Sequence, residues 1–192
     1  MQTEIENLLA KRQGHFELES GHHGDIWLDL ELLLLHPDRV VPLAEALAKR
    51  VAVHNVSAIC GPLVEGAFVG LLVASAMNIS FTYSQPTRTT ESGLFPVKYI
   101  IPKTLRSQLQ GKRVAIVNDV INAGSAVRGT LADLRQCGAE PVVIATLAVL
   151  GESAQSLSAE EKVALETLAS FPNQIWKPAE CPLCARGVSL TM

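Results

Sequence analysis

The chain has 192 residues, of which 48% are hydrophobic and 18% are charged, and its formal net charge is −3. This length and composition predict one globular domain with a buried core and exclude a disordered chain. A negative net charge without a basic stretch argues against a general nucleic-acid binder, which needs clustered Lys and Arg side chains.

The sequence contains no segment that predicts a membrane span or a signal peptide. The longest apolar stretch, residues 67–77, is too short to cross a bilayer. The N-terminus has early acidic residues and no apolar core followed by small residues. Four cysteines do not make a disulfide framework in a chain of this length. We therefore expect a cytoplasmic protein with reduced thiols and no membrane partner.

The first elements along the chain predict a small N-terminal lobe over residues 1–36. Thr3 and Glu6 have the spacing of a capping box, which predicts a helix to about residue 12. Apolar residues then alternate with polar residues on both sides of Ser20-Gly21, which is the pattern of short strands. The apolar positions are Phe16, Leu18, Ile26, Leu28 and Leu30.

From residue 37 onward, predicted helices alternate with continuous apolar strands. Asp38 predicts the start of a helix over residues 38–51, and helices are also expected at 66–77 and 126–137. Strands are expected at 56–60, 79–83, 114–117 and 142–150. This alternation is typical of an α/β core, a mostly parallel sheet flanked by helices, here over residues 37–155. Residues 156–192 are expected to add a helix beginning near Ser158 and a tail within the same domain.

A group of polar residues follows the predicted strand at 114–117. Asn118 and Asp119 come directly after it, where parallel sheets bind ligands. Small side chains at 122–126 would let an anion approach the free N–H groups that open the next helix. A carboxylate beside such a loop suits a sugar phosphate. The alternative is that Asp119 caps a turn and Ser125 caps the helix. Neither G-x-G-x-x-G nor G-x-x-x-x-G-K-[ST] is present, which argues against a dinucleotide enzyme and a P-loop ATPase.

This stretch resembles the phosphoribosyl-diphosphate (PRPP) signature of the type I phosphoribosyltransferases, in which aliphatic residues precede two acids and a loop around glycine. Other motifs, in the family order, resemble the orotate phosphoribosyltransferases, and the similarity covers roughly residues 8–150. These motifs are Gly14-His15-Phe16 with Leu18, Ser20-Gly21 and Asp29, Cys60-Gly61-Pro62 with Gly66, and Gly111-Lys112-Arg113-Val114.

The resemblance implies a Mg²⁺-dependent glycosyltransferase of pyrimidine biosynthesis that is a homodimer. It would transfer the phosphoribosyl group of PRPP to a base, with orotate as the expected acceptor, and release pyrophosphate. Asp119 would bind the ribose hydroxyls and contact Mg²⁺ indirectly or through the substrate. Arg88 would act in catalysis from a lid over residues 84–95.

The resemblance also implies three groups of binding residues. PRPP would be bound by Asn118, Asp119, Asn122, Ala123, Gly124, Ser125 and Ala126. The pyrophosphate loop would be Gly61, Pro62, Leu63, Val64, Glu65 and Gly66. The base pocket would include Ser20, Gly21 and Trp27.

Two further functions stay open because the sequence departs from the family pattern. Asn118 stands where the family has an acid, and the interval 84–95 contains Arg88 but no lysine or histidine. Glu152 lies where orotate enzymes place an arginine. One alternative is a non-catalytic regulator that binds PRPP or a nucleotide. The other is a transferase for a different base, with a pocket built around Trp27 and Tyr83.

The tail contains one C-x-x-C motif, formed by Cys181 and Cys184. A structural zinc needs four ligands, and the sequence shows no second pair. We therefore expect a plain turn with reduced thiols rather than a zinc site, and a metal shared between two chains is the alternative. His15, His22 and His23 flank Ser20-Gly21, but adjacent histidines in a strand point to opposite faces. A structural role is expected for them, ahead of base stacking or a subunit contact beside Trp27, and a shared metal is the least favoured alternative.

Overall fold

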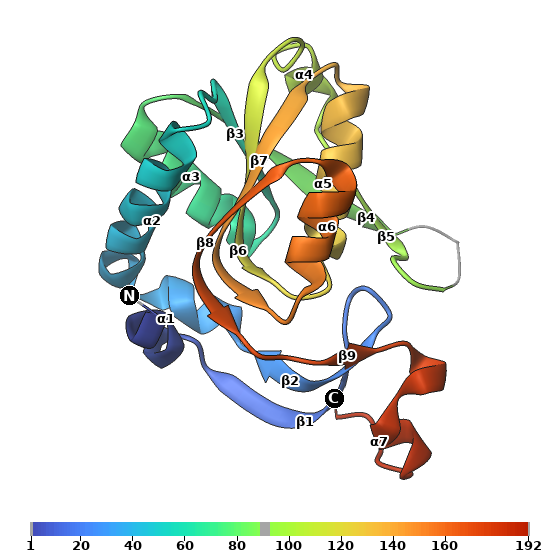
Figure 1. Ribbon diagram of the computed structural model, residues 1–192. Helices are drawn as coiled ribbons and strands as arrows, with labels where there is room; N and C mark the ends of the chain where they lie inside the picture. Colours follow the sequence, from blue (N-terminus) through green and yellow to red (C-terminus); the bar gives the residue numbers. More distant parts are fainter. Residues whose placement is uncertain (1, 89–92, 192) are drawn as a thin grey trace.

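The main sheet has six strands in the order β5-β4-β3-β6-β7-β8 (Figure 1). This computed structural model describes residues 2–88 and 93–191. Strand β5 is antiparallel to β4, and the other neighbouring strands are parallel. The predicted α/β fold with a mostly parallel sheet is therefore confirmed. The strands are β3 (Ala58–Pro62), β4 (Ser80–Arg88), β5 (Val97–Ile100), β6 (Arg113–Ile121), β7 (Glu140–Leu150) and β8 (Ala164–Phe171).

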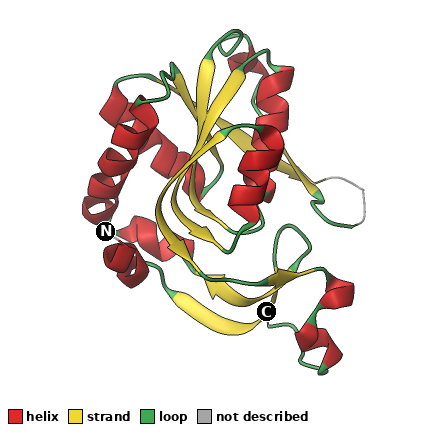
Figure 2. Cartoon of the chain, in the orientation of Figure 1, coloured by secondary structure: helices red, strands yellow, loops and turns green. Residues whose placement is uncertain are grey.

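Helices cover both faces of this sheet (Figure 2). Helices α2 (Pro37–Ala52) and α3 (Glu65–Met77) pack on one face, and α5 (Ser125–Gln136) and α6 (Ser153–Glu161) pack on the other. Strand β6 contributes side chains to the hydrophobic cores on both faces of the sheet, because its side chains alternate between the faces. Ala115 and Val117 belong to the core beneath α2 and α3, whereas Val114 and Ile116 belong to the core beneath α5 and α6.

Two expected helix boundaries differ from the structure. Helix α1 (Gln2–Leu8) ends before residue 12, because the chain enters strand β1 at Lys11. Helix α2 has His36 as its N-cap residue and Pro37 at its first position, so Asp38 lies in the first turn rather than at the cap. Proline suits that first position because its missing N–H has no helical partner there.

The predicted helix beginning near Ser158 is wrong. Ser158 lies in the second half of α6, and the residues that follow form β8, which pairs with β7 from Val143↔Ala164 to Leu150↔Phe171. The apolar residues of this segment pack on both faces of the sheet, which is the pattern of a strand rather than of an amphipathic helix. Leu165 packs on the core beneath α5 and α6, and Leu168 on the core beneath α2 and α3.

A second sheet, which we call the hood, faces the carboxyl ends of the parallel strands (Figure 1). Its strands β1 (Lys11–Glu17) and β2 (His23–Leu28) lie on either side of Ser20-Gly21, where the sequence predicts short strands, and they pair antiparallel. Its third strand, β9 (Ile175–Trp176), comes from the C-terminal part of the chain and pairs with β2. The hood is therefore built from both ends of the sequence.

Short helical turns complete the chain. They are η1 (Leu30–Leu35), α4 (Lys103–Arg106), η2 (Pro178–Glu180) and α7 (Pro182–Ala185). Among the described residues, no helix is long and apolar enough to span a membrane.

The segment expected to form a lid is partly a β-hairpin arm. Strand β4 continues to Arg88 and pairs with β5 from Gln85↔Ile100 to Arg88↔Val97. Residues 89–92 and the side chain of Arg88 lie outside the described part of the chain. The expected catalytic role of Arg88 stays a prediction.

Candidate functional site

Asn118 and Asp119 lie inside strand β6 rather than directly after it. The pairing of β6 with β7 continues to Ile121↔Val149, so the strand is longer than its apolar run predicts. Both side chains are buried, with exposed fractions of 8% for Asn118 and 4% for Asp119. They occupy the carboxyl-terminal end of the sheet, where the sequence places the ligand site.

The amide of Asn118 is packed against the start of helix α3. Its Nδ2 donates a hydrogen bond to the Val120 carbonyl oxygen at 2.8 Å. A Cβ atom at Gly66 would lie 2.1 Å from Asn118 Oδ1. Position 66 therefore accepts only glycine while Asn118 keeps this orientation, and the two sequence motifs are coupled by direct contact.

The carboxyl group of Asp119 holds its proton more tightly than an exposed aspartate. Burial raises the pKa of Asp119 to about 7, and the nearby charge of Glu65 adds to this effect. A hydrogen bond from the Val120 backbone opposes the rise in pKa. Binding a cation or a hydrogen-bond donor at this carboxylate would return the pKa toward its ordinary value.

The loop that follows β6, which the sequence predicts to be an anion cradle, leads directly into helix α5. Gly124 is the N-cap residue of α5 and has a left-handed φ of +80°, which glycine adopts without steric cost. The first N–H groups of a helix have no partner within the helix, so those opening α5 are available to an anion. Asn122 is held in place because its Oδ1 accepts a hydrogen bond from Asn173 Nδ2 at 2.9 Å.

Glu19 from the hood reaches this cradle, and sequence reasoning missed it. Its carboxylate accepts one hydrogen bond from Ser125 Oγ at 2.8 Å and another from Tyr99 Oη at 2.9 Å. Burial, together with the negative charge of Glu19, raises the pKa of Tyr99. The only sequence signal for Glu19 is that an acidic residue stands beside the Ser20-Gly21 turn. The sequence does not show which element that turn faces.

The predicted pyrophosphate loop connects the end of β3 with the start of α3. A Cβ atom at Gly61 would lie 2.6 Å from the Ala67 Cα atom, so the close approach of the helix to the strand requires glycine. The Leu63 N–H donates to the Ser84 carbonyl oxygen at 2.8 Å, and the Leu63–Val64 peptide bond is cis. The hydrogen bond to Ser84 and the close packing at Gly61 hold the start of the loop, and Gly66 at its end lies against Asn118.

The Ser20-Gly21 turn, which forms the tip of the hood, contacts the described residues that precede β5 in the hairpin arm. The Phe95 N–H donates to the Ser20 carbonyl oxygen at 2.9 Å. Gly21 has a φ of +77°, and a Cβ atom there would lie 3.2 Å from the Gly93 carbonyl oxygen. Glycine at position 21 therefore allows the two backbones to approach this closely.

These segments enclose a cavity of about 250 Å³ between the hood and the main sheet. The predicted site residues that line it come from the hood, the pyrophosphate loop and the anion cradle. They are Ser20, Trp27, Pro62, Leu63, Val64, Glu65, Gly66, Asn118, Asp119, Asn122, Ala123, Gly124, Ser125 and Ala126. Gly21, Gly61 and Tyr83 are not among its lining residues.

The described lining of the cavity carries negative charge. It includes Glu19, Glu65 and Asp119 and contains no lysine or arginine. An anionic substrate would therefore depend on backbone N–H groups and on cations that come with it.

Comparison with known proteins agrees with this geometry. Residues 34–182 match the Phosphoribosyl transferase domain family. The chain belongs to the phosphoribosyltransferases. This phosphoribosyltransferase is 30% identical to the orotate phosphoribosyltransferase of Pelotomaculum thermopropionicum, over 93% of this chain and 87% of that protein. It is 28% identical to the orotate phosphoribosyltransferase of Helicobacter pylori strain P12, over 96% and 93% of the two chains.

Solved structures show the same fold. The crystal structure of orotate phosphoribosyltransferase from Aeropyrum pernix has a TM-score of 0.63 and 24% identity, covering 84% of this chain and 88% of that chain. The adenine phosphoribosyltransferase from Thermoanaerobacter pseudethanolicus has a TM-score of 0.69 and 17% identity, covering 89% of this chain and 100% of that chain. This phosphoribosyltransferase is a type I enzyme that transfers the phosphoribosyl group of PRPP to a base.

Proposed function

We propose that the acceptor base is orotate and that the product is orotidine 5′-phosphate, a step of pyrimidine biosynthesis. The observation that carries this proposal is the similarity to orotate phosphoribosyltransferases over nearly the whole chain. The cavity lies between the hood and the sheet, and Trp27 from β2 lines it with Ile26 and Leu28. A planar base would have an apolar and aromatic wall there.

The residues of the cavity have separate roles in the proposed reaction. A ring nitrogen of the base attacks the anomeric carbon of PRPP, and the bond from that carbon to pyrophosphate breaks. The ionised carboxylate of Asp119 accepts hydrogen bonds from the ribose hydroxyls and stabilises positive charge on the sugar. The N–H groups at residues 124–126 bind the 5′-phosphate. The loop from Gly61 to Gly66 faces the leaving pyrophosphate.

The proposal includes Mg²⁺ as the cofactor that accompanies PRPP. The donor set fits this ion, because Mg²⁺ prefers oxygen ligands and Glu65 and Asp119 both line the cavity. The ion would be held mainly by the oxygens of the substrate, with Asp119 in contact through the substrate. Bound in this way, Mg²⁺ neutralises charge on the diphosphate.

The test is release of pyrophosphate from PRPP with Mg²⁺ over a panel of bases, with PRPP affinity measured in the same samples by titration calorimetry. Release with orotate is the expected result. PRPP binding without release for any base would identify the non-catalytic regulator and contradict the proposal. Omission of Mg²⁺ from the same assay tests the cofactor.

A second acceptor, an uncharged base, is favoured by one observation. Orotate carries a carboxylate, yet the described lining of the cavity holds three acids and no lysine or arginine. Glu152, where orotate enzymes would place an arginine, lies in a groove next to the cavity rather than in it. In the base panel, turnover of uracil or adenine in the absence of orotate turnover would establish this second candidate.

We also propose that the enzyme is a homodimer. Helix α3 exposes the apolar side chains of Phe68 and Leu71, which are three residues apart and share one face of the helix. Val64, directly before α3, is half exposed as well. Contact with a second copy of the chain would bury these side chains. The cytoplasmic location expected from the sequence stays a prediction.

A further inference from the structure

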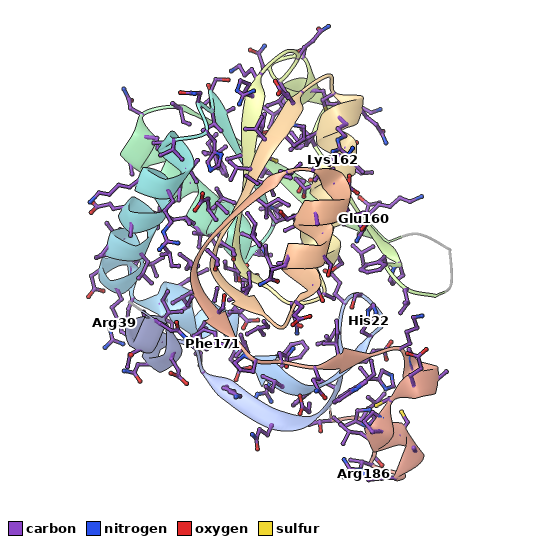
Figure 3. All side chains as sticks on the ribbon, viewed as in Figure 1. His22, Arg39, Glu160, Lys162, Phe171 and Arg186 are labelled. Carbon is purple, nitrogen blue, oxygen red and sulfur yellow. The ribbon has the colours of Figure 1, made fainter. Side chains whose placement is uncertain are left out.

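Four residues with metal-binding side chains meet at the outer side of the hood. His15 comes from β1, His23 from the start of β2, Cys181 from the end of η2 and Cys184 from α7. The potential ligand atoms all lie within 4.8 Å of one another. The cluster joins the hood to the C-terminal turn that carries Arg186 (Figure 3).

Four of the distances between the ligand atoms lie within a few tenths of an ångström of those around a tetrahedral zinc ion, and the two shortest would lengthen slightly around a bound ion. Bonds of about 2.0–2.1 Å to nitrogen and about 2.3 Å to sulfur place neighbouring ligand atoms about 3.3–3.8 Å apart. His15 Nε2 lies 3.4 Å from Cys181 Sγ and 3.7 Å from Cys184 Sγ. His23 Nδ1 lies 3.2 Å from Cys184 Sγ and 3.0 Å from His15 Nε2.

The other ring nitrogen of His15 has the partner expected of a metal ligand. His15 Nδ1 lies 2.7 Å from the Val188 carbonyl oxygen, which can only accept a hydrogen bond. Nδ1 therefore carries the proton in the neutral ring, and the lone pair of Nε2 points into the cluster. Metal-binding histidines commonly donate their second N–H to a carbonyl in this way.

The C-terminal tail has almost no apolar core of its own. Within residues 177–191, all of which the structure describes, only Cys181 is buried, and of the others only Leu183 is half-buried. His15 and His23 are buried as well, with exposed fractions of 1% and 7%, whereas Cys184 is exposed. The tail thus contacts the hood through polar and sulfur groups rather than through an apolar cluster.

We propose that His15, His23, Cys181 and Cys184 bind one structural Zn²⁺ ion within a single chain. Two thiolates and two imidazoles form a closed four-ligand set of the type that structural zinc sites use. The sequence pattern conceals this site because Cys181 and His15 are 166 positions apart. The adjacent His22 is not a ligand, since its ring contacts Ser20 Oγ and the Phe95 ring instead.

The ion would hold the tail and β9 on the hood, whose strand β2 lines the substrate cavity. This role differs from that of Mg²⁺, because the cluster lies outside the cavity lining. The proposal therefore does not depend on the identity of the acceptor base.

The test measures bound zinc in the full-length chain, purified under reducing conditions with any metal-binding tag removed. Mass spectrometry of the metal content should give one Zn²⁺ per chain. Replacing the zinc with Co²⁺ should give the intense visible bands of tetrahedral cobalt together with a thiolate charge-transfer band. The cobalt spectrum needs no variant, so it stays informative if a substitution impairs folding.

Substitutions at a proposed ligand and at matched control positions test where the ion binds. Cys184→Ser changes an exposed ligand and should lower Zn²⁺ affinity more than about a hundredfold, because loss of a ligand exceeds the effect of losing a supporting hydrogen bond. The controls Cys137→Ser and His22→Ala should retain one Zn²⁺. A chelator should lower the melting temperature of the natural chain and leave that of Cys184→Ser unchanged. Wild-type zinc content equal to that of Cys184→Ser, or a cobalt spectrum without the thiolate band, would overturn the proposal.

Discussion

Asp119 shows how one buried carboxyl group links stability to function. The pKa of an aspartate in the unfolded chain is about 3.9, whereas burial raises the pKa of Asp119 in the folded protein to about 7. The folded state therefore binds the proton more tightly. The contribution of Asp119 to stability should therefore be lost as pH rises from about 4 to about 7 and should change no further above that range.

Asp119→Asn removes this titration. The variant should gain stability relative to the natural chain as pH rises, by about 2–4 kcal/mol above pH about 7. Urea unfolding of both proteins at about pH 5 and about pH 8 measures the difference. PRPP affinity of the variant should be reduced most at about pH 8, where the natural carboxyl group is ionised, because an amide cannot replace the ionised acceptor. A stability difference that is the same at both pH values would contradict this account.

Glu19 places a negative charge at the cradle expected to receive a phosphate. Its hydrogen bond from Ser125 must break if the phosphate is to use that hydroxyl. Glu19→Gln keeps the shape and removes the charge, so PRPP affinity should rise about 2- to 10-fold at low salt and less at high salt. Calorimetric titration at two salt concentrations measures this. Glu17→Gln, on β1 outside the cavity lining, is the control. Weaker PRPP binding by Glu19→Gln would mean that Glu19 assists the substrate.

At the scale of the elements, Asp133 of α5 anchors the connection that follows β5. Its Oδ2 accepts hydrogen bonds from the Ile101 N–H and from Arg106 Nη1, each at 2.7 Å. Asp133→Ala should cost about 2–4 kcal/mol, because it leaves a buried N–H without an acceptor and a cation without its partner. Urea unfolding measures this cost.

Arg106→Ala is the matched control for this connection. It removes the more exposed partner and leaves the hydrogen bond from Ile101 to Asp133 intact. We expect a loss of only about 0–1 kcal/mol. Equal costs for the two substitutions would show that the ion pair, rather than the buried N–H, stabilises this connection.

At the scale of the whole molecule, the exposed apolar face of α3 predicts self-association. The natural chain should have twice the chain mass by light scattering on a sizing column. Replacing Phe68 and Leu71 together by aspartate should give a monomer, because burial of two charges at the contact is unfavourable. Val53→Asp, an exposed apolar position at the end of α2, should remain a dimer. A monomeric natural chain would contradict the proposal.

Local pattern predicted most of the sheet and its helices but failed at the C-terminal part. Leu165 and Leu168 are three residues apart, a spacing that fits one face of a helix. The structure sends them to opposite faces of β8, because pairing with β7 outweighs the local preference. Strand β9 consists of two residues, and its place in the hood depends on pairing with β2.

The sequence by itself determined the α/β core, and it predicted the loop at residues 122–126 and Asp119 as binding residues, because these are properties of one continuous stretch. Only the tertiary structure decided that Glu19 reaches Ser125 and that Gly66 packs against Asn118. It also decided that His15 and His23 join Cys181 and Cys184. Each of these contacts joins segments that are distant in sequence. A spacing pattern describes neighbours along one element, whereas these distances are set by how the hood, the sheet and the tail pack together.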